Sequence, residues 1–184
     1  MTEKMDGKNM EFFHVVTERP MHLGQQIFFD EIHHSGVYDR VMEKKALVEK
    51  IYAEPEQFAG KELDHHTLVA LRELALEEVR CEKYPGYPSR MSSLYVSKTL
   101  EEANKWFDFF TEIGRPTFQI VKVRVNGRVF EGNANNCFDG GKDKNANMEL
   151  AEKYWQCVGL GDEQAVREIL VDGMIEVVEI VKEK

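Results

Sequence analysis

The residue with the clearest chemical potential in this sequence is Glu168, which lies in the apolar stretch 166–171. Strand alternation places Glu168 on one face with Val166 and Leu170, and the opposite face is also largely apolar, which predicts an interior strand. A buried carboxylate without a partner is costly, so Glu168 must be paired, protonated or at the wall of a cleft. A structural carboxylate paired with a lysine or arginine at a sheet margin stays open beside a functional role.

Two further side chains with usable chemistry, His14 and Tyr95, also fall in short apolar segments. His14 lies in the middle of 12–16, a predicted strand that ends before Pro20, because proline pushes the preceding residue out of helical space. Tyr95 lies in the predicted short strand 92–97. From local sequence alone, a core or edge role explains His14 better than a ligand contact, whereas Tyr95 is as readily a core residue as one that stacks on a ligand.

The elements that must position these residues include two glycine-containing turns. Asp172-Gly173 lies between two apolar runs and is a strong hairpin signal, and Asn126-Gly127 follows the alternating strand 117–125. Hairpins predict an antiparallel or mixed sheet in the α+β class rather than a doubly wound nucleotide fold. No glycine-rich phosphate loop has the required spacing.

Helical patterns fill the region 37–82, with a break at Pro55. Asp64 is a predicted N-cap for a helix whose apolar residues recur every three or four positions. The opposite face of that helix is predicted to be exposed to solvent and carries Arg72, Glu73, Glu77 and Glu78. Residues 25–34 show a weaker helical pattern.

Later signals are local and short. Thr99 and Glu102 form a capping box, which predicts that a helix follows. Residues 132–147 are rich in Asn, Gly and Asp, which is typical of a long exposed loop. Asn147 is the predicted cap of a helix that reaches Val158.

Composition fits one domain spanning 1–184. The net charge of −9 argues against broad nucleic-acid binding, which needs a basic surface. Cys81, Cys137 and Cys157 have neither a disulfide nor a zinc spacing. The polar N-terminus lacks signal-peptide features and no apolar run is long enough to cross a membrane, so a cytoplasmic location is expected.

Three of these segments, taken in order and in their strand contexts, resemble the motifs of the ADP-ribosyltransferase-like superfamily. They are residues 13–17, residues 93–97 with the capped helix that follows, and residues 167–171. In that superfamily the motifs supply a His-Tyr-Glu triad, which here corresponds to His14, Tyr95 and Glu168. The whole chain also resembles an uncharacterised bacterial family, of bacillus type, placed in this superfamily. The resemblance implies an α+β fold with a mixed or antiparallel split sheet and a helical insertion after the first strand, here 37–82.

The resemblance also implies NAD as substrate, cleaved at the nicotinamide–ribose bond. His14 would hydrogen-bond a ribose hydroxyl, and Tyr95 would stack on the nicotinamide. Glu168 would accept a hydrogen bond from the nicotinamide ribose and stabilise the positive charge that develops there, an interaction that strengthens at low dielectric.

Four other residues complete the expected NAD contacts. Thr17 and Ser93 belong to the motifs themselves, and Trp106 or Phe107 would form a second aromatic wall. Arg90 could hold a phosphate of the dinucleotide bidentately, although a loop arginine paired with an acid explains it equally.

Two positions depart from the superfamily pattern. Val15 stands where glycine often follows the histidine, and Val166 stands where the arginine-modifying branch has an acid. Arginine modification is therefore not expected, and an acidic chain is poorly suited to modify DNA or RNA. The acceptor stays open, with a protein among the candidates.

Two alternatives compete with a transferase. One is a non-catalytic domain of the same fold that binds a nucleotide or a protein. The other is a metal-dependent hydrolase that uses His22, His33, His34, His65 and His66. Neighbouring histidines diverge on a helix or strand and no metal motif is present, so no metal is predicted.

Overall fold

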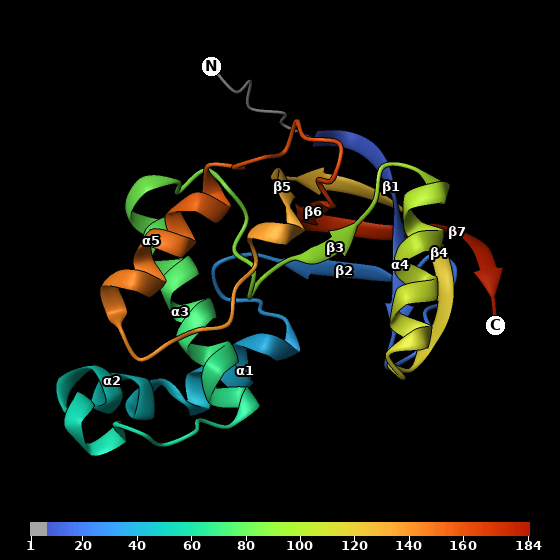
Figure 1. The fold of residues 1–184 in the computed structure, drawn as a ribbon. Coiled ribbons are helices and arrows are strands. Elements are labelled where there is room, and N and C mark those ends of the chain that lie inside the picture. The colour runs from blue at the N-terminus through green and yellow to red at the C-terminus, as the bar shows by residue number, and fades with distance from the viewer. Residues whose placement is uncertain (1–6) are drawn as a thin grey trace. The chain divides into compact units, whose positions relative to one another are not determined.

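The computed structural model describes residues 7–184, and within it the chain divides into two compact units. The first unit contains the residues up to His33 together with Ser92–Glu131 and Glu168–Lys184. The second contains His34–Met91 and Gly132–Arg167. Strands dominate the first unit and helices the second (Figure 1), which agrees with the predicted α+β class.

The first unit contains two antiparallel sheets. The four-stranded sheet has the order β1 (Gly7–Thr17), β4 (Thr117–Gly127), β7 (Gly173–Glu183) and β2 (Gln26–Phe29). The three-stranded sheet has the order β3 (Leu94–Val96), β6 (Arg167–Val171) and β5 (Val129–Asn133). The strand that carries Glu168 is therefore the interior strand that the sequence predicts.

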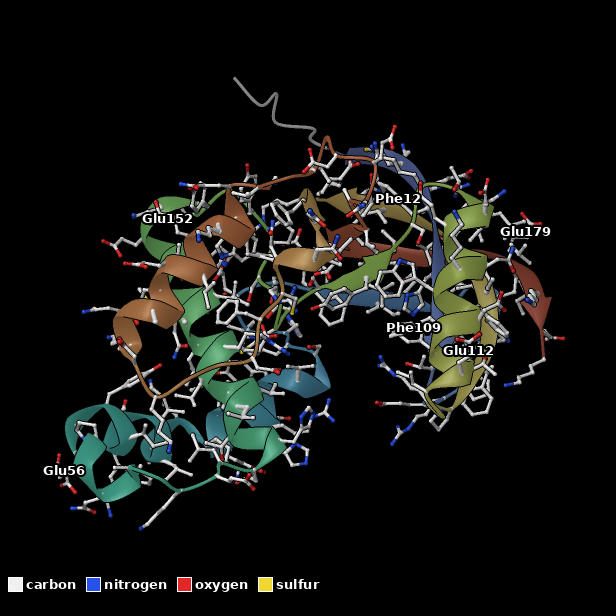
Figure 2. All side chains as sticks on the ribbon, in the orientation of Figure 1. Phe12, Glu56, Phe109, Glu112, Glu152 and Glu179 are labelled. Atoms are coloured by element: carbon white, nitrogen blue, oxygen red, sulfur yellow. The ribbon has the colours of Figure 1, made fainter. Side chains whose placement is uncertain are left out.

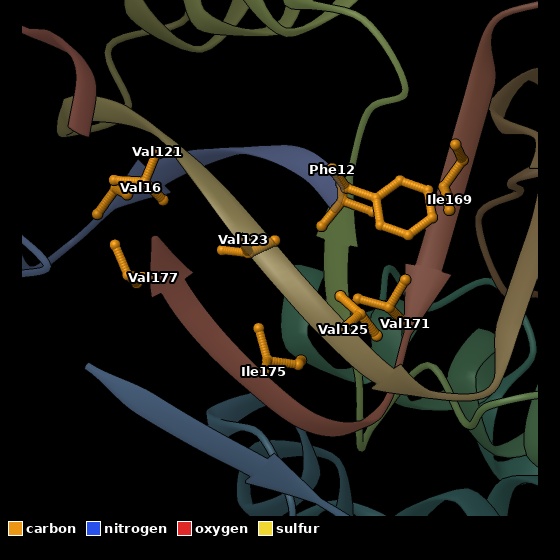
Figure 3. Close-up of a cluster of buried hydrophobic side chains, with 10 residues drawn as sticks. Phe12, Val16, Val121, Val123, Val125, Ile169, Val171, Ile175 and Val177 are labelled. Carbon is orange, nitrogen blue, oxygen red and sulfur yellow. The ribbon is translucent and has the colours of Figure 1, made fainter. Parts of the chain in front are cut away.

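Apolar side chains from both sheets form one buried cluster (Figure 3). Phe12 of β1 and Ile169 of β6 point toward each other, and Val125 of β4 lies beside Val171 of β6. All four side chains are at most 1% exposed. Burial of this apolar surface is the main force that holds β6 against the larger sheet.

The two predicted hairpin turns are wrong, because the strands on either side of each turn belong to different sheets. The carboxylate of Asp172 accepts hydrogen bonds from the backbone N–H and the Nε of Arg128, at 2.7 and 2.8 Å. Gly173 has φ +76°, and a Cβ there would lie 2.2 Å from the carbonyl oxygen of Asn126. Glycine thus allows two backbones to meet where the chain passes between sheets.

Two more strands differ from their sequence predictions. The segment 25–34 contains β2 rather than a helix, because Gln26–Phe29 pairs with β7. The polar residues 1–10 predict a loose tail, but β1 begins at Gly7 and pairs with β4 along most of its length. Residues 1–6 of that expected tail lie outside the described residues.

The helix of the first unit, α4 (Leu100–Glu112), begins as predicted. Thr99 accepts a hydrogen bond from the N–H of Glu102 at 3.2 Å. Ala103 and Phe107 on the buried side of α4 pack with Val15 and Ile120 from the four-stranded sheet. The α4 cluster therefore covers one face of the strand that carries His14.

The second unit confirms the predicted helical segment. It contains α1 (Gly36–Glu43), α2 (Lys45–Ala53), the short 3-10 helix η1 (Pro55–Phe58), α3 (His65–Lys83), η2 (Ala134–Asn136) and α5 (Lys144–Trp155). Asp64 caps α3 as predicted, accepting from the N–H of Thr67 at 2.9 Å. No helix in the described part of the chain is long and apolar enough to span a membrane.

The cap of α5 is a correction. Asp143, rather than Asn147, accepts the capping hydrogen bond, from the N–H of Ala146. Asn147 is buried instead, and its amide donates to the carbonyl of Gly141 at 2.7 Å. The preceding loop is not simply exposed: a Cβ at Gly140 would lie 2.4 Å from the Cβ of Leu71.

Candidate functional site

The first unit brings together the strands that carry the three triad candidates. His14 is on β1, Tyr95 on β3 and Glu168 on β6. β1 and β3 meet at a bridge between Phe13 and Ser97, whose backbone N–H groups donate to each other's carbonyls at 2.9 and 2.7 Å. This bridge joins the two sheets one residue before His14 and two residues after Tyr95.

His14 and Tyr95 are in direct contact. The Nδ1 of His14 lies 2.7 Å from the carbonyl oxygen of Tyr95. A carbonyl oxygen can only accept, so Nδ1 carries the proton and donates it. When the imidazole is neutral, its Nε2 then has a free lone pair, which is the form needed to accept a hydrogen bond from a ligand hydroxyl.

The surroundings of His14 favour that neutral form. Burial of the ring lowers its pKa and outweighs the hydrogen bond to Tyr95, which raises it; the positive charge of Arg115 lowers it further. The result is a pKa of about 4 instead of the ordinary 6.5, although part of the residue remains in contact with solvent. At neutral pH His14 is therefore uncharged.

We predict that the His14 ring titrates with a midpoint near pH 4 and stays neutral from pH 6 to 8. The measurement is an NMR titration of the histidine ring protons, with the His14→Gln spectrum used to assign the resonance. A midpoint near 6.5 would contradict the burial and the proton assignment described above.

The strand register places Glu168 beside Tyr95. Tyr95 pairs with Leu170 and Val96 pairs with Ile169, so Glu168 occupies the next position along β6. Alternation sets Glu168 on the same face as Leu170, diagonal to Tyr95, a relation that corresponds to about 7–8 Å in antiparallel pairs. Glu168 is half-buried, not enclosed in the core as the apolar pattern predicts, because it lies at the end of the strand where exposure begins.

The β3 segment offers two more features to a ligand. The ring of Tyr95 is 39% exposed although its strand neighbours Val96 and Leu170 are buried. The hydroxyl of Ser93 is buried and has no hydrogen-bond partner within the described residues. A buried hydroxyl without a partner carries a desolvation penalty, which a ligand atom in hydrogen-bond reach would relieve.

The two aromatic candidates on α4 differ. Phe107 is buried, and the Nζ of Lys182 lies 4.1 Å from its ring centre. Trp106 is half-buried, with its ring centre 5.6 Å from that of Phe110 and 5.9 Å from that of Phe109, which projects from α4 (Figure 2). Of the two, Trp106 keeps the accessible surface that a stacking wall requires.

Thr17 lies at the end of β1, half-buried and paired with Thr117 at the start of β4. Its carbonyl accepts a hydrogen bond from the N–H of Arg19 at 2.8 Å, which turns the chain away after the strand. Thr17 thus shares a strand with His14 but lies three residues farther along.

Arg90 belongs to the second unit, whereas the three triad candidates belong to the first. Its Nε donates to Glu73 at 3.0 Å, and its Nη1 donates to the hydroxyl of Tyr154 at 2.7 Å. Glu73 is only 3% exposed, which corrects the prediction that its helix face is open to solvent. The guanidinium pairs with the internal carboxylate of Glu73 because a buried charge needs a partner of opposite charge.

One residue near the site was missed from sequence. Arg115 follows α4 directly, and its charge acts on His14. The signal that could have found it is the Gly114-Arg115-Pro116 turn, which holds an arginine at a fixed place between a helix and a strand.

Residues 12–183 match the family described as "Protein of unknown function (DUF2441)". This chain belongs to the DUF2441 family. The matched region begins in β1 two residues before His14 and ends in β7, so it includes all three triad candidates of the DUF2441 chain. No curated protein was found to match it.

The histidines considered for a metal site do not meet the requirement for one. Among residues 7–184 of the DUF2441 chain, no group of three or more His, Cys, Asp or Glu side chains could hold a metal ion. His33 instead pairs with Asp30 at 2.7 Å, and the ring of His34 stacks on that of Tyr38. These contacts give both histidines local roles.

Proposed function

We propose that this DUF2441 protein binds NAD at the His14–Tyr95–Glu168 site and cleaves the nicotinamide–ribose bond, passing ADP-ribose to an acceptor. The observation that carries the proposal is the 2.7 Å hydrogen bond between His14 Nδ1 and the Tyr95 carbonyl, on strands whose neighbour β6 holds Glu168 diagonal to Tyr95. Three segments far apart in the sequence thus bring an imidazole, an exposed tyrosine and a carboxylate to neighbouring strands.

Each side chain has a role that its surroundings support. Neutral His14 accepts a hydrogen bond from a ribose hydroxyl through Nε2. The exposed ring of Tyr95 stacks on the nicotinamide. The half-buried carboxylate of Glu168 accepts a hydrogen bond from the nicotinamide-ribose hydroxyl and faces the reacting carbon.

The reaction breaks the bond between the ribose carbon and the nicotinamide nitrogen. The bonding electron pair leaves with nicotinamide, and the ribose becomes an oxocarbenium-like cation. A negative charge held in place at partly reduced dielectric stabilises that cation more than it stabilises the ground state, which lowers the barrier. The acceptor nucleophile then forms the new bond to the ribose and releases its proton.

We also propose that the two sheets are those of an ADP-ribosyltransferase-like fold. An ADP-ribosyltransferase-like split sheet is supported by two antiparallel sheets that share a buried cluster and meet at the Phe13–Ser97 bridge. The acceptor is not a nucleic acid, because a net charge of −9 opposes approach to a polyanion. A protein acceptor or water fits this charge.

The proposal predicts saturable binding of NAD with slow release of nicotinamide. Calorimetric titration of the purified protein with NAD measures the binding, and chromatography of the incubated mixture measures the release. Binding without release would replace the transferase with a non-catalytic nucleotide-binding module of the same fold. Absence of binding at millimolar NAD would overturn the proposal.

A further inference from the structure

Arg115 is held in a fixed position between α4 and β4. Its backbone N–H donates to the carbonyl of Phe110 at 2.9 Å, and its carbonyl accepts from the hydroxyl of Thr117 at 2.9 Å. Gly114, with φ +78°, makes the turn that ends the helix. The Cζ of the guanidinium lies 4.8 Å from the centre of the Phe110 ring. Backbone and side chain are therefore both anchored before any ligand arrives.

The guanidinium of Arg115 has no ion-pair partner in the part of the chain that the structure describes. Among residues 7–184, Arg115 forms no ion pair with a carboxylate, whereas Lys122 lies 3.0 Å from Glu179 and Arg128 lies 2.7 Å from Asp172. The same charge is close enough to His14 to disfavour protonation of that ring. An anchored cation close to His14, with no carboxylate partner among residues 7–184, is a ready contact for an anionic part of a ligand.

In the order of neighbouring strands, those of His14 and Tyr95 lie between β4, which Arg115 precedes, and β6, which carries Glu168. β4 pairs with β1, β1 meets β3 at the Phe13–Ser97 bridge, and β3 pairs with β6. Arg115 precedes β4, while Glu168 lies on β6, so His14 and Tyr95 come between them. A ligand whose reacting ribose is at Glu168 and which extends past Tyr95 and His14 carries its next chemical group to Arg115.

In a dinucleotide the group that follows the reacting nucleoside is the pyrophosphate. We infer that Arg115 binds the pyrophosphate of the dinucleotide substrate, an inference that rests on the proposed function for the identity of that substrate. The planar guanidinium can donate two parallel hydrogen bonds to phosphate oxygens, and Phe110 supports its plane. This contact takes the phosphate role that Arg90, bonded to Glu73 in the other unit, does not fill.

The test compares NAD and ADP-ribose binding by Arg115→Gln, Arg115→Lys and the wild type. We expect Arg115→Gln to lower the affinity for both ligands by about tenfold or more, because a charge-assisted contact is lost. The affinity of Arg115→Lys should lie between those of the wild type and Arg115→Gln, since lysine keeps the charge without the bidentate geometry. Added salt should weaken wild-type binding more than Arg115→Gln binding. The matched control is Arg124→Gln, which removes an exposed arginine paired with Glu11 and should bind as the wild type does.

Equal affinity of Arg115→Gln and the wild type for NAD would overturn the inference and leave the proposed function standing. If the wild type does not bind NAD, the proposed function fails. The inference is then tested by titrating inorganic pyrophosphate and ADP into the wild type and into Arg115→Gln. Binding of those anions that Arg115→Gln loses would retain Arg115 as a diphosphate contact. Anion binding unchanged in Arg115→Gln, or absent from the wild type, would overturn it.

Discussion

Glu168→Gln is expected to reduce nicotinamide release from NAD by about 10²-fold or more while NAD affinity changes little. Glutamine keeps the size of glutamate and its ability to accept a hydrogen bond from a ribose hydroxyl. It lacks the negative charge that opposes the developing cation, and that interaction strengthens only in the transition state. Release is measured by chromatography under saturating NAD, and affinity is measured by calorimetry.

The matched control is Glu179→Gln, on β7 of the four-stranded sheet (Figure 2). Glu179 is exposed and forms a surface ion pair with Lys122 at 3.0 Å, so its loss should leave release and folding nearly unchanged. A Glu168→Gln protein with wild-type release would show that another group carries the chemistry. Loss of both release and affinity would instead make Glu168 a binding residue.

The parts of this fold that sequence predicts well are those decided by neighbouring residues. The side chains of Asp64 and Thr99 cap their helices as expected, because a capping bond spans only three residues. The strand identity of 12–16 and the interior place of the strand with Glu168 also follow from local apolar patterns.

The failures at the two turns and at β2 concern partners that are distant in sequence. Gly173 carries a real backbone signal, but its φ > 0 serves a bend between sheets as well as a hairpin turn. Gly127 is required for another reason, because a Cβ there would collide with the backbone carbonyl of Asp172. Whether the chain makes a bend between sheets or a hairpin turn depends on the strands that flank each bend, and those pair with elements elsewhere. The helix predicted from the weak pattern at 25–34 is wrong for a similar reason. Residues Gln26–Phe29 form a strand because they pair with β7, which is distant in sequence.

The candidate site also combines residues that the sequence points to with one that depends on distant partners. Motif order led to His14, Tyr95 and Glu168, and the structure places these three on neighbouring strands. The proposed phosphate contact of Arg115 could not be predicted from sequence, because the role of an arginine depends on the groups that lie opposite it. Arg90 finds Glu73 inside the second unit, and Arg115 finds no internal carboxylate in the described chain.

The pairing of Arg90 with Glu73 leads to the second large effect. Both side chains are nearly inaccessible to solvent, and the guanidinium also bonds Tyr154. Burial alone would raise the pKa of Glu73, but the positive charge and hydrogen bonds of Arg90, and then of Arg72, outweigh burial and hold that pKa below its ordinary 4.5. Glu73 is therefore ionised in the folded protein and compensates the buried arginine.

We predict that Glu73→Gln lowers the free energy of unfolding at pH 7 by roughly 3–5 kcal/mol, because it leaves a buried guanidinium without its counter-charge. Urea denaturation measures the change. Trp155 is a suitable reporter, since it is buried in the same unit and its indole N–H donates to the carbonyl of Leu76 at 2.8 Å. A Trp106→Phe background removes the other tryptophan.

The control is Glu78→Gln on the same helix, where an exposed carboxylate lies 3.4 Å from Lys144. Its loss should cost at most about 1 kcal/mol of the free energy of unfolding.

The pH dependence of stability checks independently whether the pKa of Glu73 is lowered in the folded protein. A carboxyl whose pKa is lower in the folded state stabilises the fold above its unfolded pKa, here 4.5, and this contribution is lost as the pH falls through the folded value. The stability gap between wild type and Glu73→Gln should therefore narrow as the pH falls below about 4.5. A gap that stays constant, or a Glu73→Gln protein as stable as Glu78→Gln, would mean that the buried pair contributes no net charge compensation.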